Sequence, residues 1–176
     1  AVGYALTSTW TPLSGEQSDG YLRTEYFDSI VKANAPVIVV QQDVDEPANR
    51  GAIIGDGMAF QMKALGAVGA LVEGNARDIP GIEQAGLPLW ATGRVPGHGP
   101  FNMIEHEVTV KVASLTINPG DILVCDADGA TRVTVDEAAD VAKMCAEVRA
   151  KEGALHKFFS VPDFTMDDWE EWKSKS

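Results

Sequence analysis

Two short apolar runs separated by a helical pattern place the strongest constraint on the fold. A β-branched run extends from Val37 to Val40, and a second apolar run extends from Ala67 to Val72. Uninterrupted apolar runs of this length predict strands that are buried on both faces. Between them, Gly55-Asp56-Gly57 precedes a segment with helical spacing, Met58 to Leu65, which Gly66 ends. The pattern predicts a βαβ unit with parallel strands.

The remaining elements continue this alternation and then change to hairpins after Glu107. Strands are expected at Ala1–Thr9, Leu87–Thr92, Val108–Val112, Ile122–Cys125 and Ala130–Val135. Helices are expected at Tyr21–Ala33, at Ile79–Gln84 and from Glu137 to about Glu152, where Gly153 is the expected C-cap. The sequence therefore predicts an α/β protein.

Composition limits the classes of partner. The 176 residues fit one compact domain, and 45% hydrophobic with 23% charged residues is typical of a folded globular protein. The net charge of −12 repels phosphate backbones and anionic lipid, so we expect neither nucleic acid nor a membrane surface as a partner. The apolar runs are too short to span a bilayer and no leader opens the chain, which predicts a cytoplasmic protein.

The residues best suited to catalysis or ligand binding lie at one edge of the predicted sheet. Asp56 and Gly57 start a helix, whose free amides and positive dipole end favour an anion. Arg77 and Asp78 follow the strand at Ala67–Val72, and ligands collect beyond the carboxyl ends of parallel strands. A guanidinium group binds an oxyanion, and a carboxylate binds a hard divalent cation. The alternatives are a simple helix start at Asp56 and an ordinary surface ion pair between Arg77 and Asp78.

Other sites have weaker support. Gly55-x-Gly57 lacks the third glycine of a dinucleotide loop, because Phe60 occupies that position. The three histidines, His98, His106 and His156, are scattered without the spacing of a zinc site or a catalytic triad. Asp126 and Asp128 are interpreted as a turn stabilised by side-chain hydrogen bonds.

Two segments carry a family resemblance. The strings GALVEGNARDIPGIEQAGLPLWATG and INPGDILVCDADGATRV resemble the superfamily that contains 4-hydroxy-4-methyl-2-oxoglutarate aldolases and the regulator of ribonuclease activity A. Its metal-dependent aldolase branch carries an Asp, twenty intervening residues and then Arg-Asp, and the same spacing separates Asp56 from Arg77 here. The resemblance extends from about Ala1 to Glu152.

The resemblance implies a swivelling β/β/α domain, layered as an α-β-β-α sandwich with a mixed sheet. It also implies assembly as a homotrimer or homohexamer with sites between subunits. We expect a family domain at residues 1–157 and an acidic, aromatic tail at residues 158–176. Family members begin with a helical segment before the first strand, so the chain is expected to lack that N-terminal segment.

The resemblance also assigns roles to individual residues. Asp78 is expected to bind Mg²⁺ or Mn²⁺, and Arg77 to hold the keto or enolate oxygen of a pyruvoyl group. Asp56 is expected to orient a metal-bound water, and the amides of Gly57 and Met58 to bind the substrate carboxylate. Glu152, from the last helix of a neighbouring subunit, is the expected additional catalytic residue.

These roles imply a class II, metal-dependent lyase. It would cleave 4-hydroxy-2-oxo acids to pyruvate and decarboxylate oxaloacetate, both through a metal-stabilised pyruvate enolate. The alternative is a non-catalytic regulator that binds a protein partner such as a ribonuclease, for which the acidic charge is suitable. A methyltransferase activity, with which this family has been labelled, is disfavoured because the chain has no glycine-rich nucleotide loop.

Overall fold

The computed structural model describes residues 1–15 and 20–175, and the chain divides into two compact units. The first unit spans Ala1–Val135 and the second spans Asp136–Ser176. Across the described residues, no helix combines the length and the apolar character that crossing a bilayer requires.

A mixed sheet forms the centre of the first unit and contains eight strands within the described residues. Its parallel core consists of β1 (Val2–Thr11), β2 (Val37–Asp43), β4 (Ala67–Ala76) and β5 (Leu89–Arg94). The short β3 (Ala52–Ile54) pairs in parallel with the end of β4. Antiparallel pairings beside β1 come from β6 (Asn102–His106), β9 (Ile122–Cys125) and, through β9, β10 (Ala130–Val133).

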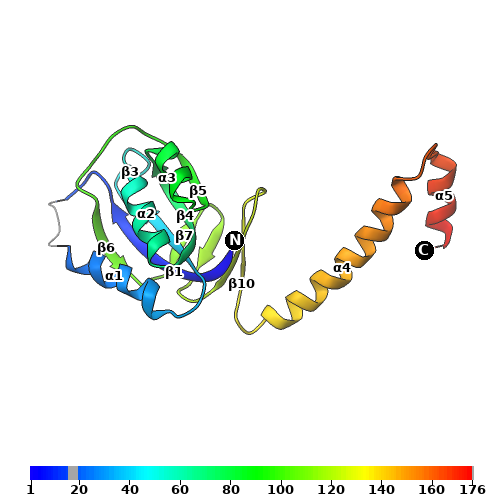
Figure 1. Cartoon of the computed structure of the whole chain (residues 1–176), viewed down its shortest axis with the longest axis horizontal. Coiled ribbons are helices and arrows are strands. Elements are labelled where there is room, and N and C mark those ends of the chain that lie inside the picture. The colour runs from blue at the N-terminus through cyan, green and yellow to red at the C-terminus, as the bar shows by residue number, and fades with distance from the viewer. Residues whose placement is uncertain (16–19, 176) are drawn as a thin grey trace. The chain divides into compact units, whose positions relative to one another are not determined.

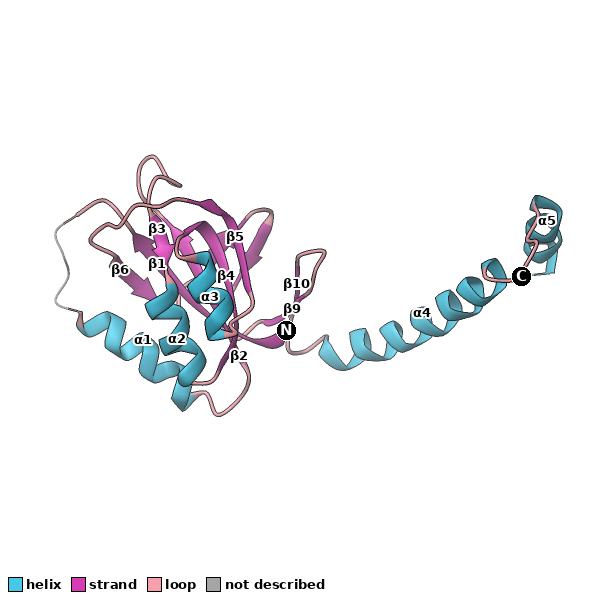
Figure 2. Ribbon diagram, turned by 45° about the horizontal axis from the view of Figure 1, so that its top comes forward, coloured by secondary structure: helices cyan, strands magenta, loops and turns pink. Residues whose placement is uncertain are grey.

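Three helices cover one face of this sheet, as Figures 1 and 2 show: α1 (Tyr21–Lys32), α2 (Asp56–Ala64) and α3 (Ile79–Ala85). Their inward side chains, among them Phe27, Met62 and Ile82, pack on Val39 and Val72 of the sheet in one hydrophobic cluster. Burying a side chain of this size contributes about 1.5–3 kcal/mol, so this cluster holds the helix starts at fixed places along the sheet.

The opposite face carries a second β layer. The hairpin of β7 (Val110–Val112) and β8 (Leu115–Ile117) places Val110 and Ile117 against Ile38, Val40 and Leu71. Because successive strand residues point to opposite faces, β2 contributes to both clusters. The predicted burial of Val37–Val40 on both faces is therefore confirmed.

The α/β class and the mixed sheet are confirmed by this architecture. The parallel pairing of the two apolar runs is also confirmed, since Val39 lies opposite Ala70. The first unit contains the helix, sheet and hairpin layers of the expected α-β-β-α sandwich, while the next helix along the chain, α4, belongs to the second unit.

β4 is longer than the sequence predicts. The expected end was Val72, but the strand continues to Ala76 across a register shift between Val72 and Asn75. Gly74 has a φ of 157°, which glycine adopts without a Cβ penalty, so the chain can bulge there and then resume pairing. The extension carries the strand directly to Arg77 and Asp78.

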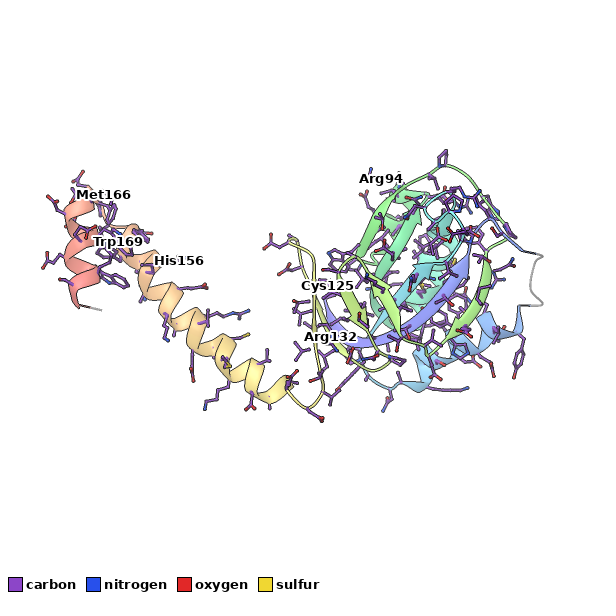
Figure 3. All side chains as sticks on the ribbon, turned by 180° about the vertical axis from the view of Figure 1, so that it is seen from behind. Arg94, Cys125, Arg132, His156, Met166 and Trp169 are labelled. Atoms are coloured by element: carbon purple, nitrogen blue, oxygen red, sulfur yellow. The ribbon has the colours of Figure 1, made fainter. Side chains whose placement is uncertain are left out.

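The second unit consists of α4 (Ala138–Phe159) and α5 (Met166–Lys175). Aromatic contacts join them: the Phe158 and Trp172 ring centroids lie 5.6 Å apart, and those of Phe159 and Trp169 lie 5.3 Å apart. Figure 3 shows Trp169 between α5 and the end of α4. Stacked and edge-on rings of this kind add stability beyond the area that they bury.

The expected end of α4 at Gly153 is wrong. The helix passes through Gly153 and ends at Phe159, where Ser160 is the C-cap. A glycine inside a helix costs only about 1 kcal/mol relative to alanine, and the aromatic contacts of Phe158 and Phe159 with α5 stabilise the continued turns. The expected division between residues 157 and 158 stays a prediction; α4 runs through that position, and the two compact units divide between Val135 and Asp136.

Candidate functional site

The end of β4 fixes Arg77 and Asp78 through backbone contacts. The Arg77 amide donates to the Ile54 carbonyl oxygen at 3.0 Å, which ties the end of β4 to β3. Asp78 then adopts a left-handed conformation with φ 55° and ψ 41°, which Asp tolerates better than most residues. Its carbonyl oxygen accepts hydrogen bonds from Gly81 and Ile82 in the first turn of α3, at 2.9 and 3.1 Å.

The Asp78 carboxylate forms an ion pair with Arg77. Its Oδ2 lies 3.2 Å from Arg77 Nη1, and the Arg77 and Asp78 side chains are 25% and 39% exposed. A pair at this level of exposure adds little to stability. Both side chains therefore remain accessible to a ligand.

The start of α2 brings Asp56 to the same place. Gly55 is the extended N-cap residue, and a Cβ built on it would lie 3.1 Å from Arg77 Nε and 3.2 Å from Asp78 Oδ2. A Cβ built on Gly81 would lie only 2.5 Å from the Cβ of Asp56. The absence of side chains at these two glycines lets α2, α3 and the end of β4 approach closely. The structure thus brings Asp56, Arg77 and Asp78 together.

Asp56 and Arg77 line a small pocket of about 210 Å³, and Asp78 contacts Arg77 without being one of the lining residues. It is lined by Arg23, Gly55, Asp56, Gly57, Met58, Arg77, His98 and Phe101. Typical sites for drug-sized ligands are about 300–1,000 Å³, so this pocket is suited to a small metabolite.

One atom of the pocket wall lacks a partner. Arg77 Nε is buried and makes no hydrogen bond within the described part of the chain. The guanidinium carbon of Arg77 lies 5.7 Å from the centroid of the Phe101 ring. This cation–π contact helps to fix the position of the guanidinium group. A buried donor without an acceptor is uncommon in folded proteins and favours an acceptor from a ligand or a water.

The backbone amides at the start of α2 show one contact that the sequence did not predict. The Gly57 amide donates to Asp56 Oδ1 at 2.6 Å. A substrate carboxylate that binds this amide would therefore compete with the Asp56 side chain. Met58 also lines the pocket.

The donor set fits a hydrated magnesium ion better than a fully enclosed metal. Among residues 1–15 and 20–175 there is no group of three or more His, Cys, Asp or Glu side chains arranged to hold a metal. Mg²⁺ is commonly bound through one or two carboxylates and retains several waters. Asp78, with Asp56 nearby, matches that requirement, whereas a structural zinc site needs four protein ligands.

Glu152 is not among the residues that line this pocket. It lies on α4 in the second unit, and its side chain is exposed. Sequence reasoning also missed three lining residues, namely Arg23, His98 and Phe101. The last two belong to the loop after β5, where Phe101 has a φ of 57° and its ring centroid lies 4.8 Å from that of His98.

The Asp126–Asp128 turn has the structural role that we predicted. Asp126 Oδ1 accepts a hydrogen bond from the Asp128 amide at 2.9 Å. This is the side-chain turn bond expected of Asp in such a loop.

Comparison with known proteins identifies the family. The family model described as "RraA-like: Aldolase/RraA" matches residues 2–132. This chain belongs to the RraA-like family. The matched region lies within the first unit and contains Asp56, Arg77 and Asp78.

Individual relatives carry different descriptions. A protein of Halalkalibacterium halodurans named as a candidate 4-hydroxy-4-methyl-2-oxoglutarate aldolase is 29% identical over 170 residues, which cover 88% of this chain and 78% of that protein. The Methanocaldococcus jannaschii protein MJ0644 is 26% identical over 120 residues, covering 68% of this chain but only 58% of that protein.

A solved structure supports the fold. Streptomyces coelicolor RraAS2, described as an unusual member of the RNase ES inhibitor RraA protein family, superposes with a TM-score of 0.71 at 24% identity. The match covers 88% of this chain and 75% of that one. It establishes a shared RraA-like fold.

Proposed function

We propose that this RraA-like chain is a divalent-metal-dependent lyase that cleaves 4-hydroxy-2-oxo acids to pyruvate and decarboxylates oxaloacetate. The observation that carries the proposal is the buried, unpartnered Nε of Arg77, a residue that lines a small pocket together with Asp56 and whose Nη1 lies 3.2 Å from the Asp78 carboxylate. The resemblance of the relative named as a candidate aldolase also supports it.

In this proposal Arg77 binds the 2-oxo oxygen of the substrate. Breaking the bond between C3 and C4 moves its electron pair into a pyruvate enolate, so negative charge grows on that oxygen in the transition state. A guanidinium group aimed at the developing charge stabilises the transition state more than the ground state. Losing one such donor costs on the order of 10²–10³ in rate.

Asp78, with Asp56 nearby, would hold a divalent cation, which would supply Lewis-acid stabilisation of the developing enolate charge. Asp56 accepts the proton of the 4-hydroxyl group on its Oδ2, since its Oδ1 accepts the bond from the Gly57 amide. In oxaloacetate the leaving group is CO₂, so no hydroxyl proton has to be removed. The enolate then takes at C3 the proton held by Asp56, or a proton from water in the oxaloacetate reaction, and leaves as pyruvate.

We further propose a homotrimer or homohexamer in which Glu152 enters the site of a neighbouring chain. Support comes from α4, in which the structure leaves none of the described side chains buried. Val141, Met144 and Val148 are exposed and recur at helical spacing along it. An unpaired apolar stripe on a long helix is typical of a helix that packs on a partner.

The test is a pyruvate-release assay on oxaloacetate and on several 4-hydroxy-2-oxo acids, with Mg²⁺, with Mn²⁺ and with EDTA. Mg²⁺ without protein provides the blank. Asp78→Ala is expected to lower the metal-dependent rate on the order of 100-fold, because it removes the metal ligand. Asp128→Ala, in an exposed turn, is the matched control. Full Mg²⁺-dependent decarboxylation by Asp78→Ala would overturn the metal assignment.

The second candidate function is a non-catalytic regulator. The description of the Streptomyces relative as a member of a ribonuclease inhibitor family favours it, as does the net charge of −12. A regulator predicts no pyruvate release above the blank under any metal condition, together with binding to a basic protein partner. The same assay therefore separates the two functions.

A further inference from the structure

A second arginine reaches the pocket from a different element. Arg23 lies in the first turn of α1, its side chain is half-buried, and it lines the 210 Å³ pocket together with Asp56 and Arg77. Arg23 also lines a larger groove of about 800 Å³ between α1 and α2. Figure 2 shows these two helices on the same face of the sheet.

The pocket and the groove adjoin each other. Both are lined by Arg23, Gly57 and Met58, so the start of α2 forms a shared wall between them. A ligand whose oxo end lies at Arg77 can therefore extend past the start of α2 toward Arg23. Gly57 leaves this route open, because a Cβ built there would meet no atom within 4 Å.

Arg23 has no ion-pair partner in the described part of the chain, in contrast to Arg77 and Arg132. The acidic groups that line the two cavities are Asp56 in the pocket and Asp28 in the groove, and neither pairs with Arg23. The net charge of −12 repels anions from most of the chain. An unpaired guanidinium group in a cavity wall therefore provides a local site that attracts an anionic group.

We propose that Arg23 binds a second carboxylate of the substrate and so selects dicarboxylic over monocarboxylic 2-oxo acids. The inference rests on the proposed function, because it places the oxo end of the substrate at Arg77. A guanidinium group presents a rigid fork of donors that matches a carboxylate, and such charged hydrogen bonds are about twice as strong as neutral ones. Arg23 is thus a specificity-determining residue, whereas Arg77 contacts the reacting atoms.

Binding without turnover gives the direct test. Calorimetry with Mg²⁺ compares 2-oxoglutarate with 2-oxopentanoate, which has the same chain length but a methyl group in place of the distal carboxylate. Neither ligand carries a leaving group at C4. Wild-type protein is expected to bind 2-oxoglutarate at least about tenfold more tightly than 2-oxopentanoate, because one charged hydrogen bond contributes about that much affinity.

Arg23→Gln, which keeps much of the side-chain length but removes the charge, is expected to reduce this preference to about twofold or less by weakening 2-oxoglutarate binding alone. Arg23→Lys is expected to keep part of the preference. Lys32→Gln removes one positive charge from the exposed C-terminal end of the same helix and is expected to keep all of it. That control excludes a general effect of net charge.

An activity assay is the second test, and it distinguishes failure of the lyase proposal from failure of the role proposed for Arg23. If the lyase proposal is right, Arg23→Gln lowers kcat/KM for 4-hydroxy-2-oxoglutarate but not for 4-hydroxy-2-oxopentanoate. No pyruvate from either substrate with wild-type protein would contradict the proposed function, while the binding preference still tests Arg23. An equal loss of both ligands in Arg23→Gln, an unchanged preference, or no preference in the wild type would overturn the assignment of Arg23.

Discussion

At the scale of single residues, two glycines determine how closely the reactive side chains approach. Gly55 faces Arg77 and Asp78, and Gly81 faces Asp56. Neither glycine is needed for an unusual backbone angle, since Gly55 has an extended φ of −133° and Gly81 lies within α3. Their role is to leave space, and that role is testable by adding one methyl group.

Gly55→Ala places this methyl group 3.1 Å from Arg77 Nε and 3.2 Å from Asp78 Oδ2. These side chains must then move by a few tenths of an ångström. Small displacements of positioned groups cost large factors in rate, so we expect a drop in kcat of about tenfold with a melting temperature changed by only about 3 °C or less. Pyruvate release and thermal unfolding measure the two effects.

Gly97→Ala is the control for this change, because a Cβ at Gly97 meets no atom within 4 Å. It is expected to leave both kcat and the melting temperature close to those of the wild type. Unchanged kcat in Gly55→Ala would show that the approach of Arg77 and Asp78 to α2 does not matter for the reaction.

Residue-level prediction from sequence succeeded where a motif exists. Asp56, Arg77 and Asp78 were identified from the ends of predicted elements and from a family spacing, and the structure brings them together. Arg23, His98 and Phe101 belong to no motif. They reach the pocket because α1 and α2 lie on the same face of the sheet and because the loop after β5 brings Phe101 to Arg77. Both arrangements depend on tertiary structure.

At the scale of elements, the turn after β2 is organised by a buried carboxylate. Asp43 is 5% exposed, and its two oxygens accept hydrogen bonds from the amides of Asp45 and Asn49 at 2.8 and 2.7 Å. Burial nevertheless raises the pKa of Asp43 above its usual 3.8, with the two amide bonds opposing the shift. The folded state therefore holds this proton more tightly than the unfolded chain does.

The sign of the resulting pH dependence follows from that shift. A raised carboxyl pKa adds stability that is complete below the unfolded pKa and is lost as the pH rises through the folded pKa. We expect the free energy of unfolding of the wild type, minus that of Asp43→Asn, to fall as the pH rises from about 3.8 and to level off above the folded pKa. Denaturant unfolding across this range measures it. A difference that rises with pH would contradict the raised pKa.

The sequence predicts a helix or strand correctly only where the local pattern of apolar residues is strong. Long apolar runs such as Val37–Val40 gave the right strands, but β3 and β6 were missed because three to five residues carry too little periodicity. The helix expected to end at Gly153 and the strand expected to end at Val72 both continue beyond these residues. In each case contacts with another helix or strand outweigh a local preference of about 1 kcal/mol. The helix α5 was also missed, and its contacts with α4 are aromatic pairings made across a turn.

At the scale of the whole molecule, one candidate catalytic residue, Glu152, lies in a different unit from Asp56, Arg77 and Asp78. Both hydrophobic clusters are built from residues of Ala1–Val135, and the family model ends at residue 132. Glu152 lies beyond them, on α4. The core of the first unit therefore requires no residue of the second, whereas the proposed lyase requires Glu152 from a neighbouring chain.

This separation gives the final prediction. A chain that ends at Val135 is expected to keep a cooperative thermal unfolding transition, because both clusters are intact, but to lose pyruvate release at least as strongly as Glu152→Gln in the full chain. Glu152→Gln is expected to lower kcat about 10- to 100-fold, since it removes an acid–base group. Glu147→Gln, five residues earlier on the same exposed helix, is the matched control and is expected to retain activity.

Mixing experiments then decide whether Glu152 acts within its own chain or on a neighbour. A Glu152→Gln chain retains Arg77, and an Arg77→Gln chain retains Glu152, so each supplies what the other lacks. If Glu152 acts on a neighbouring chain, unfolding and refolding the two inactive variants together restores part of the wild-type rate, because some mixed assemblies contain one complete site. If it acts within its own chain, no mixture regains activity. The second result would remove the need for an oligomer in the proposed reaction and leave each chain with a complete site of its own.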